Sequence, residues 1–382
     1  MKIAVISMIR EPWGGSEELW ADMARIALEK KYTVIHSTFE FDKVAFKEQD
    51  LINKGLIHIK RRGFIKPGTP AFKRIPMKLL IRLKNLISNP FESVFRFSPD
   101  YVLYNGTCYS IADENMLLNI LQKKKVPFGI LGHFNRDDGT DINSKKASIL
   151  KQVLQTATNA FFISQRSKNV TEQKINSSIE NGIVVRNPVN MPSTEIVAFP
   201  KSNTVQFATV GNLRIIHKGQ DIILDIFTQP QWKKRDWHLN IYGSGEDEFQ
   251  LKEMAATLGL DDKVTFHGSV TDIRKLWANN HILLMPSRME GMPLAIVEAM
   301  LCGRPSVVTD VGGHKEWIEN GIEGWIAAKA TVDSYSKALE EAWQQKDKWE
   351  QVGISAHDKA MKLYEPEPGK KLLDLILKSV QD

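Results

Sequence analysis

The sequence predicts an α/β protein with two Rossmann-like domains, each built on a doubly wound parallel sheet. The chain has 382 residues, which is more than one hydrophobic core usually organises. Short apolar runs alternate with helical patterns in two separate series, and glycine-containing loops follow several of these runs. A polar, proline-rich stretch separates the two series. We therefore expect an N-terminal domain over 1–190, a linker over 191–203, a C-terminal domain over 204–363 and a final helix within 364–382.

The first series begins with an apolar strand over 2–6, a loop with two glycines, a helix over 17–30 and a strand over 33–38. This order is typical of the start of a doubly wound sheet, whose ligands bind at the carboxyl edge of the strands. Gly15 lies in that loop and would let the backbone approach a phosphate or a sugar closely. Many glycine loops only turn the chain, so the loop alone leaves both interpretations open.

The first series continues with strands over 101–104, 127–132, 160–164 and 183–186. His133 directly follows the second of these strands and is therefore expected at the same edge as Gly15. A lone histidine is more often a hydrogen-bonded structural residue than a catalytic one. Arg136, Asp137 and Asp138 follow it, either as contacts for a substrate or as ordinary loop residues.

A basic segment interrupts this domain. Residues 60–97 contain ten Lys or Arg and one acid, Glu92, although the whole chain carries only +6. Leu79, Leu83 and Leu86 would share one face of a helix whose opposite face is basic, as in helices that lie on anionic lipid. The alternative is a helix that packs on the core and exposes its basic face. Since the rest of the chain sums to about −3, binding to nucleic acid is not expected.

The second series has strands over 205–210, 238–242, 264–266, 281–285 and 306–309, with helical patterns between them. The loop after its first strand contains Asn212, Arg214 and Lys218. Two cations between a strand and a helix are well placed to neutralise a diphosphate, although solvated basic loops are common.

Two glutamates stand out in the stretch 281–316. Glu298 lies in a helical run of apolar residues, so its carboxylate needs a partner. Glu290 lies in the loop before that helix. The start of the helix, Gly291, Met292, Pro293 and Leu294, would add free amide groups and the positive end of a helix dipole. The corner thus offers anion binding beside two carboxylates that can accept hydrogen bonds from hydroxyls, as a phosphorylated sugar requires. For an isolated glutamate, a structural ion pair is the commoner explanation.

The spacing favours the binding interpretation. Glu290 and Glu298 are followed by Cys302-Gly303-Arg304-Pro305, Gly312-Gly313 and Glu316. This pattern resembles the E-x7-E region of the retaining GT-B glycosyltransferases of family 4, also called glycosyl transferases group 1. The resemblance is strong over about 205–328 and diffuse over the N-terminal half. It implies two domains that face an interdomain cleft, a nucleotide-diphosphate sugar as donor, and a C-terminal helix that returns to the first domain.

The resemblance also implies roles for particular residues. Lys218 would hold the donor phosphates, and Arg214 would replace the family's usual arginine, whose position is Asn212 here. Glu290 would position the hydroxyls of the donor sugar, and Glu298 would hold the ribose. The resemblance further implies that Gly15 contacts the donor phosphates and that His133 lies close to the transferred sugar and the acceptor. Arg136 and Asp137 are candidate acceptor contacts because they follow His133 in the same loop.

The resemblance implies a metal-independent hexosyltransferase, which needs no cofactor beside its sugar-nucleotide co-substrate. The chain has no Asp-x-Asp motif and no cluster with metal-ligand spacing, so no divalent cation is expected. Glycan and lipid-linked acceptors are both expected partners, and the basic segment is a candidate for contact with anionic membrane. The two cysteines, Cys108 and Cys302, lie in apolar runs, and no apolar run is long enough to cross a bilayer. A cytoplasmic location, with possible peripheral contact at the inner face of the membrane, is expected.

Three other functions are compatible with parts of the sequence. A glycosidase needs two carboxyls on opposite sides of the bond, roughly 5 to 9.5 Å apart, whereas Glu290 and Glu298 belong to a single loop-helix unit. A catalytically silent sugar-nucleotide-binding module would share the same motifs, and so would a UDP-sugar epimerase of related fold. Measurement of nucleotide release and analysis of the sugar product would separate these alternatives from a transferase.

Overall fold

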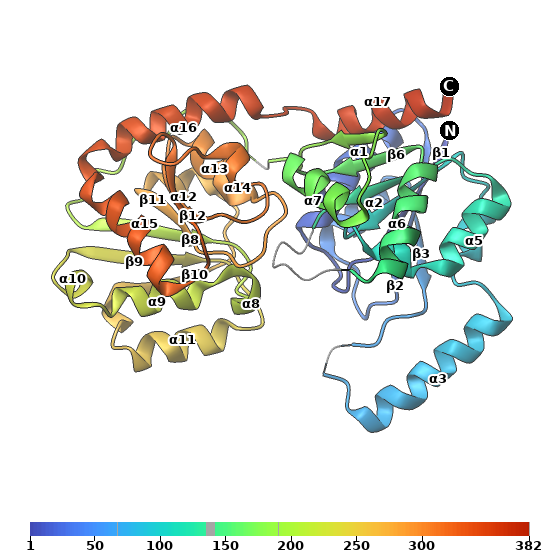
Figure 1. Ribbon diagram of the computed structural model, residues 1–382, viewed down its shortest axis with the longest axis horizontal. Helices are drawn as coiled ribbons and strands as arrows, with labels where there is room; N and C mark the ends of the chain where they lie inside the picture. The colour runs from blue at the N-terminus through green and yellow to red at the C-terminus, as the bar shows by residue number, and fades with distance from the viewer. Residues whose placement is uncertain (67, 135–141, 190, 382) are drawn as a thin grey trace. The chain divides into compact units, whose positions relative to one another are not determined.

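The computed structural model describes residues 1–66, 68–134, 142–189 and 191–381. It divides into two compact units, the first comprising Met1–Pro188 with Glu365–Asp382 and the second comprising Val189–Tyr364 (Figure 1). Each unit is a parallel sheet with helices on both faces, so the predicted pair of doubly wound α/β domains is confirmed. Residues 191–203, the predicted linker, belong to the second unit, where the buried Arg304 guanidinium donates to the backbone carbonyls of Val197 and Ala198 at 3.0 and 2.6 Å.

The first unit has a seven-stranded parallel sheet in the order β3-β2-β1-β4-β5-β6-β7. Its strands are β1 (Lys2–Ser7), β2 (Thr33–Phe39), β3 (Ile57–Arg61), β4 (Tyr101–Gly106), β5 (Phe128–Gly132), β6 (Asn159–Phe162) and β7 (Gly182–Val184). Its helices are η1 (Gly15–Glu17), α1 (Glu18–Glu29), α2 (Phe46–Asn53), α3 (Ala71–Ile87), α4 (Glu92–Phe95), η2 (Ser110–Asp113), α5 (Asn115–Lys124), α6 (Ser144–Thr156), α7 (Gln165–Ile175) and α17 (Pro368–Gln381). The sequence-based prediction lacks β3, which lies within a strongly charged run.

The last helix, α17, packs along α1. The amide of Gly369 donates to Asp22 Oδ2 at 3.0 Å, and a Cβ at position 369 would lie 2.4 Å from the same oxygen, so only glycine fits there. Leu372, Leu373 and Ile376 on one face of α17 are fully buried. The end of the chain is therefore a structural part of the first unit.

Helix α3 behaves in the opposite way, because none of its residues is buried (Figure 1). The Arg62 side chain connects it to the rest of the unit by donating to Asn85 Oδ1 at 2.8 Å and to the carbonyl of Lys84 at 3.1 Å. The helix begins six residues before the predicted apolar pattern at Met77 and contains Pro76.

The second unit has a six-stranded parallel sheet in the order β10-β9-β8-β11-β12-β13. Its strands are β8 (Val205–Val210), β9 (Trp237–Tyr242), β10 (Val264–Gly268), β11 (Ile282–Met285), β12 (Ser306–Thr309) and β13 (Gly324–Ala327). Its helices are α8 (Ile215–Lys218), α9 (Gln220–Phe227), α10 (Pro230–Lys233), α11 (Glu248–Thr257), η3 (Asp261–Lys263), α12 (Ile273–Ala278), α13 (Leu294–Leu301), α14 (His314–Trp317), α15 (Val332–Gln344), η4 (Lys346–Lys348) and α16 (Trp349–Leu363). The short edge strand β13 is absent from the sequence-based prediction.

The core of the second unit is rich in tryptophan. Trp232, Trp237 and Trp349 are buried in one cluster with Phe207 and Phe227, and the Phe227 and Trp237 rings stack with centroids 4.0 Å apart. Large aromatic side chains contribute a large buried apolar area to the stability of a core.

The strand orders locate the point where each sheet reverses direction. In the first sheet β1 lies between β2 and β4, and in the second β8 lies between β9 and β11. In open α/β sheets, ligands bind beyond the carboxyl ends of the strands at this switch point. The loops after β1 and β4 in the first unit, and after β8 and β11 in the second, are therefore the positions where a site is expected.

Candidate functional site

In the second unit, the structure brings Lys218 and Glu290 together. Lys218 ends α8, just after the β8 loop, and its Nζ lies 2.5 Å from Glu290 Oε1 in the loop after β11. The Ser287 hydroxyl donates to the same carboxylate oxygen at 2.9 Å. The Glu290 side chain is only 8% exposed. A buried, charge-assisted hydrogen bond of this kind holds both groups at defined positions.

The two loops are also joined through their backbones. The amides of Arg288 and Met289 donate to the carbonyl of His217 at 2.8 and 3.1 Å. The Arg288 guanidinium forms a two-pronged ion pair with Asp221, with both distances 2.7 Å. Lys218 and Glu290 therefore lie on a rigid base rather than on two independent loops.

The charge of Glu290 follows from its neighbours. Burial alone would raise the pKa of this carboxyl, but the charge of Lys218, the nearby His314 and the hydrogen bonds from Lys218 and Ser287 outweigh burial and lower the pKa below its usual value. Glu290 is therefore ionised at neutral pH and acts as an acceptor only.

Glu298 has a different environment. It lies in the middle of α13, is 9% exposed, and its carboxylate forms no hydrogen bond or ion pair with any residue in the described ranges. Burial raises its pKa to about 7. In particular, the buried Arg304 does not neutralise it, because that guanidinium donates to backbone carbonyls instead. Glu298 is thus a buried acceptor without a donor.

Glycines allow neighbouring loops to approach these two loops closely. Gly243, after β9, has a φ of +133°, and a Cβ there would lie 1.8 Å from the carbonyl oxygen of Gly211. Gly312, after β12, has a φ of +51°, and a Cβ there would lie 2.4 Å from the carbonyl oxygen of Glu290. Both positions therefore need glycine, because the main chain of one loop packs directly on the next.

The start of α13 supplies amide groups. Pro293 is the residue before the first helical turn and has no N–H, whereas the amides of Gly291, Met292 and Leu294 donate to no other residue in the part of the chain that the structure describes. These groups lie at the positive end of α13, where an anion is stabilised.

Arg214 and Asn212 lie at the beginning of the same loop. Arg214 Nε lies 2.6 Å from Glu246 Oε1, in the loop after β9, so this cation is engaged in an ion pair. The Asn212 side chain is exposed, and its backbone carbonyl accepts from Gln220 Nε2 at 3.0 Å. Among the described residues, no group of three or more His, Cys, Asp or Glu could hold a metal ion.

In the first unit, a cavity of about 800 Å³ lies beside the carboxyl ends of β1, β4 and β5. Its wall includes residues of the β1 loop, β3, α3 and α5, among them Arg61, Ile81, Glu114 and His133. A Cβ at Gly15 in the β1 loop would meet no atom within 4 Å, so the backbone is open to a ligand there. Arg136, Asp137 and Asp138 lie outside the described residues.

His133 is 7% exposed at the end of β5 and lies in the wall of this cavity. Its Nε2 lies 2.6 Å from Asn105 Oδ1, at the end of β4. Its Nδ1 has no hydrogen-bond partner among the described residues. Burial lowers the pKa of His133 to about 3, so the ring is neutral at ordinary pH.

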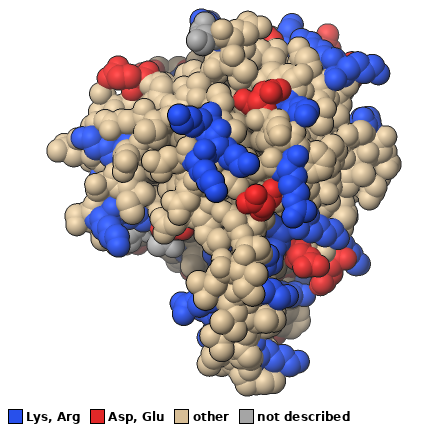
Figure 2. Space-filling view, turned by 90° about the vertical axis from the view of Figure 1, so that its right-hand side faces the viewer, with Lys and Arg blue, Asp and Glu red and all other residues tan. Residues whose placement is uncertain are grey.

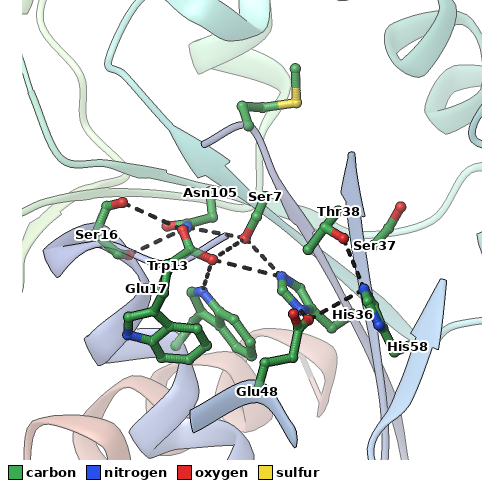
Figure 3. Close-up of polar contacts among 12 residues, drawn as sticks. Ser7, Trp13, Ser16, Glu17, His36, Ser37, Thr38, Glu48, His58 and Asn105 are labelled. Carbon is green, nitrogen blue, oxygen red and sulfur yellow. Dashed lines mark hydrogen bonds and ion pairs between the residues drawn. The ribbon is translucent and has the colours of Figure 1, made fainter. Parts of the chain in front are cut away.

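Asn105, the hydrogen-bond partner of His133, belongs to a buried polar network that the sequence analysis missed (Figure 3). Glu17 accepts from Asn105 Nδ2 at 2.7 Å, from the Ser7 hydroxyl at 2.7 Å and from Trp20 Nε1 at 2.8 Å. Ser7 Oγ also lies 2.9 Å from His36 Nε2, and His36 Nδ1 lies 2.7 Å from Glu48 Oε1. Glu17, Ser7, His36, Glu48 and Asn105 are all nearly inaccessible to solvent.

The members of this network are distant in sequence and meet because their strands are neighbours. Ser7 ends β1, His36 lies on β2 and Asn105 lies on β4, so the order β2-β1-β4 puts the three side chains side by side. Polar residues at the ends of otherwise apolar strands were the available signal in the sequence.

The comparisons with known proteins concern the second unit most directly. Residues 204–345 match the family described as glycosyl transferases group 1. This stretch of the chain is therefore similar to a group 1 glycosyl transferase domain. The match contains both glutamates, Lys218 and the glycines around them.

Relatives with curated descriptions agree with this domain. An uncharacterized glycosyltransferase of Haemophilus influenzae is 29% identical over 179 residues, which is 47% of this chain and 49% of that protein. The lipopolysaccharide 1,6-galactosyltransferase of Salmonella typhimurium is 26% identical over 157 residues, 40% of this chain and 43% of that protein. The chain thus spans about half or less of the length of these relatives.

Solved structures extend the similarity of the group 1 domain to the whole fold. HepE of Anabaena, in complex with UDP and glucose, has a TM-score of 0.74 at 17% identity, with all of both chains covered. The lipopolysaccharide outer core galactosyltransferase WaaB, in its apo form, has a TM-score of 0.68 at 19% identity, with 99% of both chains covered. At this identity the similarity concerns the fold, and the predicted GT-B architecture is confirmed. Within the described residues, none of the helices combines the length and the apolar character that a membrane span requires.

Proposed function

We propose that the protein is a metal-independent, retaining glycosyltransferase of family 4 that transfers a sugar from a nucleotide-diphosphate sugar to a hydroxyl group of a glycan, glycolipid or small-molecule acceptor. Polysaccharide or cell-envelope glycan biosynthesis is the expected setting. The observation that carries the proposal is Glu298, a buried carboxylate without a donor in a group 1 domain. The hydroxyls of a nucleotide ribose would supply the missing hydrogen bonds. UDP and UDP-glucose in the HepE structures support a UDP-sugar as donor, and a GDP-sugar is the alternative.

In this proposal the diphosphate binds to Lys218, to Arg214 and to the amides of Gly291, Met292 and Leu294. Lys218 begins in an ion pair with Glu290, and Arg214 in one with Glu246. A diphosphate would compete for both cations, and Glu290 would then have oxygen atoms available for the hydroxyls of the donor sugar. Such cationic groups stabilise the charge that develops on the leaving group without a metal ion.

The transfer itself needs no covalent bond to the enzyme. The acceptor oxygen forms a bond to the anomeric carbon on the face that the diphosphate leaves, while the bond from that carbon to the phosphate oxygen breaks. The acceptor proton passes to an oxygen of the departing nucleoside diphosphate. The configuration at the anomeric carbon is thereby retained.

We assign the acceptor to the first unit, in the cavity lined by His133. Gly15 remains a predicted donor contact. The cavity wall combines the cation Arg61 and the polar His133 with apolar side chains such as Ile81 and Phe91. This composition fits an acceptor with hydroxyl groups and an apolar portion. Arg136 and Asp137 remain predicted acceptor contacts.

We further propose that residues 60–97 bind an anionic membrane surface through α3. In Figure 2 this helix forms the lower projection, whose surface is largely uncharged and bordered by Lys and Arg. Leu86 and Ile87 are 83% and 86% exposed, and the apolar surface continues over Phe72, Ile75, Leu79, Leu80 and Leu83. Five Lys or Arg and no acid lie on α3. Apolar area together with charge attraction is what holds a helix in the interface of an anionic bilayer.

Vesicle sedimentation tests this contact. The full chain is expected to sediment with vesicles that contain phosphatidylglycerol and to remain in solution with phosphatidylcholine alone. K78E/R82E and L83S/L86S should each abolish sedimentation, whereas the exposed pair K252E/K337E on the second unit should not. Equal sedimentation of all variants would overturn the proposed role of α3.

The donor assignment is tested by thermal unfolding with a panel of UDP-, GDP- and ADP-sugars. At least one member should raise the midpoint temperature, and Glu298→Ala should remove that increase. Nucleotide release with added octyl glucosides, followed by determination of the anomeric configuration, then separates a retaining transferase from a silent module or an epimerase. No stabilisation by any member of the panel would overturn the proposal.

A further inference from the structure

Asn105 connects the buried Glu17 to His133, and its own orientation is fixed by its surroundings. One end of its side-chain amide faces two acceptors, a Glu17 carboxylate oxygen at 2.7 Å and the backbone carbonyl of Ser16 at 3.3 Å. A backbone carbonyl can only accept, so the NH2 group must lie at this end. The amide oxygen then faces His133.

The protonation of the His133 ring follows from this orientation. Asn105 Oδ1 carries no hydrogen, so the Nε2 that lies 2.6 Å away must donate to it. A neutral imidazole carries one ring hydrogen, and Nδ1 is therefore an acceptor. Nδ1 has no partner among the described residues, although His133 is buried and lies in the wall of the cavity.

Glu17 is held as firmly as the asparagine. Ser7, Trp20 and Asn105 donate to its two oxygens, and its side chain is almost completely buried between η1, β1 and β4 (Figure 3). Rotation of Asn105 by half a turn would place its oxygen against the Glu17 carboxylate and the Ser16 carbonyl. The network thus excludes the other orientation of Asn105 and, with it, the other tautomer of His133.

We infer that Glu17 and Asn105 are positioning residues that hold His133 with Nε2 protonated, so that Nδ1 accepts a hydrogen bond from a hydroxyl group of a sugar bound in the cavity. The sugar ligand rests on the proposed function, whereas the tautomer does not. His133 then orients the sugar hydroxyl by accepting a hydrogen bond from it, and His133 donates no proton to the ligand.

The first experiment measures the tautomer in the full chain without ligand. Two-dimensional 15N NMR of protein labelled at histidine should give His133, assigned by comparison with H133Q, one protonated and one unprotonated ring nitrogen. Both signals should stay constant from about pH 8 to about pH 5.5, a range in which an ordinary histidine titrates. The opposite tautomer, or a ring that gains a proton in this range, would overturn the inference.

Variants test whether the network causes this state. N105A removes the acceptor at Nε2, and E17Q replaces a pure acceptor by a group that also donates to Asn105. Each should turn the single His133 tautomer into a mixture. T38V is the matched control, because Thr38 lies at the far end of the network, where its hydroxyl contacts His58 Nε2 at 2.8 Å. Unchanged His133 signals in N105A and E17Q would show that the network does not set the tautomer. If N105A does not fold, E17Q and the unmodified chain still decide.

The ligand is tested with UDP-glucose and octyl glucoside, singly and together. The unprotonated Nδ1 signal should move in the direction of hydrogen-bond acceptance, while the Nε2 signal stays in place. If UDP-glucose raises the midpoint temperature of unfolding and Nδ1 still does not respond to either probe, the role of His133 is wrong and the proposed function stands. If the single tautomer is observed but no sugar nucleotide binds, the proposed function fails and the positioning by Glu17 and Asn105 stands.

Discussion

The two units each contain a buried glutamate near the switch point of a sheet, and the two glutamates differ in one respect. Glu17 in the first unit accepts hydrogen bonds from Ser7, Trp20 and Asn105. Glu298 in the second accepts none from the described residues. Burial raises the pKa of both, although neighbouring groups partly counteract the effect on Glu17. Burial therefore does not distinguish a structural carboxylate from a binding one, whereas the presence or absence of donors does.

The largest expected effect is on stability, from Glu17→Ala. The change leaves three buried donors without an acceptor, and each costs about 1–3 kcal/mol. Because the surroundings compensate part of this cost, the free energy of unfolding is expected to fall by about 3–5 kcal/mol. Urea unfolding measures it. Glu29→Ala at the end of the following helix, α1, is the control, because Glu29 pairs only at the surface with Arg25 and should cost less than about 1 kcal/mol. Equal effects of the two changes would remove the structural half of the comparison.

The next largest effect is expected for Lys218. Its ion pair with Glu290 is intermediate between the three donors of Glu17 and the absence of described donors at Glu298. Lys218→Ala leaves a buried carboxylate unpaired and removes the proposed phosphate contact. The turnover rate with the nucleotide sugar that raises the midpoint temperature of unfolding should therefore fall by a factor of about 10² to 10³. Lys252→Ala, which removes a surface pair with Glu248, should leave turnover unchanged. If the turnover of K218A stays within a factor of three of that of the unmodified chain, the activation free energies differ by only about 0.6 kcal/mol, and this ion pair is structural.

A pH titration gives a third test. The pKa of Glu298 is 4.5 without burial and about 7 in the folded chain. Between these values the folded chain binds the proton more strongly than the unfolded chain does, so the contribution of Glu298 to stability is full below about pH 4.5 and falls as the pH rises to about 7, by about 3 kcal/mol in all. Unfolding at a series of pH values should show this slope in the unmodified chain and not in Glu298→Gln. Parallel curves for the two proteins would contradict the raised pKa.

The smallest effect is on affinity, from the same Glu298→Gln variant. The amide keeps one acceptor oxygen but loses the charge, so the Kd for UDP at pH 8 should rise about tenfold, or 1.4 kcal/mol. Calorimetry measures it. Stability at that pH should stay the same or increase, because a buried charge without a partner has been removed. Loss of stability comparable to that of Glu17→Ala would place Glu298 in the structural class.

The sequence was sufficient for the fold where the patterns are local. Alternating strands and helices predict both doubly wound sheets, and the regular spacing from Glu290 to Glu316 is enough to indicate the group 1 domain. The strand β3 escaped prediction because Lys60 and Arg61 end its apolar pattern, and the edge strand β13 escaped because a run of four residues is too short to be told from a loop.

Sequence reasoning named candidate site residues but did not predict the contacts between them. Sequence reasoning assigned Lys218 and Glu290 to separate groups of a ligand, whereas the structure pairs them with each other. It also predicted that Glu290 and Glu298 share one small volume, which stays a prediction. The network of Ser7, Glu17 and Asn105 depends on the order of strands, which no local pattern contains.

The distribution of tryptophan has a practical consequence for these measurements. Seven of the nine tryptophans, from Trp232 to Trp349, belong to the second unit, and only Trp13 and Trp20 belong to the first. Intrinsic fluorescence will therefore follow the unfolding of the second unit almost alone, whereas circular dichroism detects helices in both. A midpoint that differs between the two optical signals would reveal that the units melt separately, and Glu17→Ala should widen that difference.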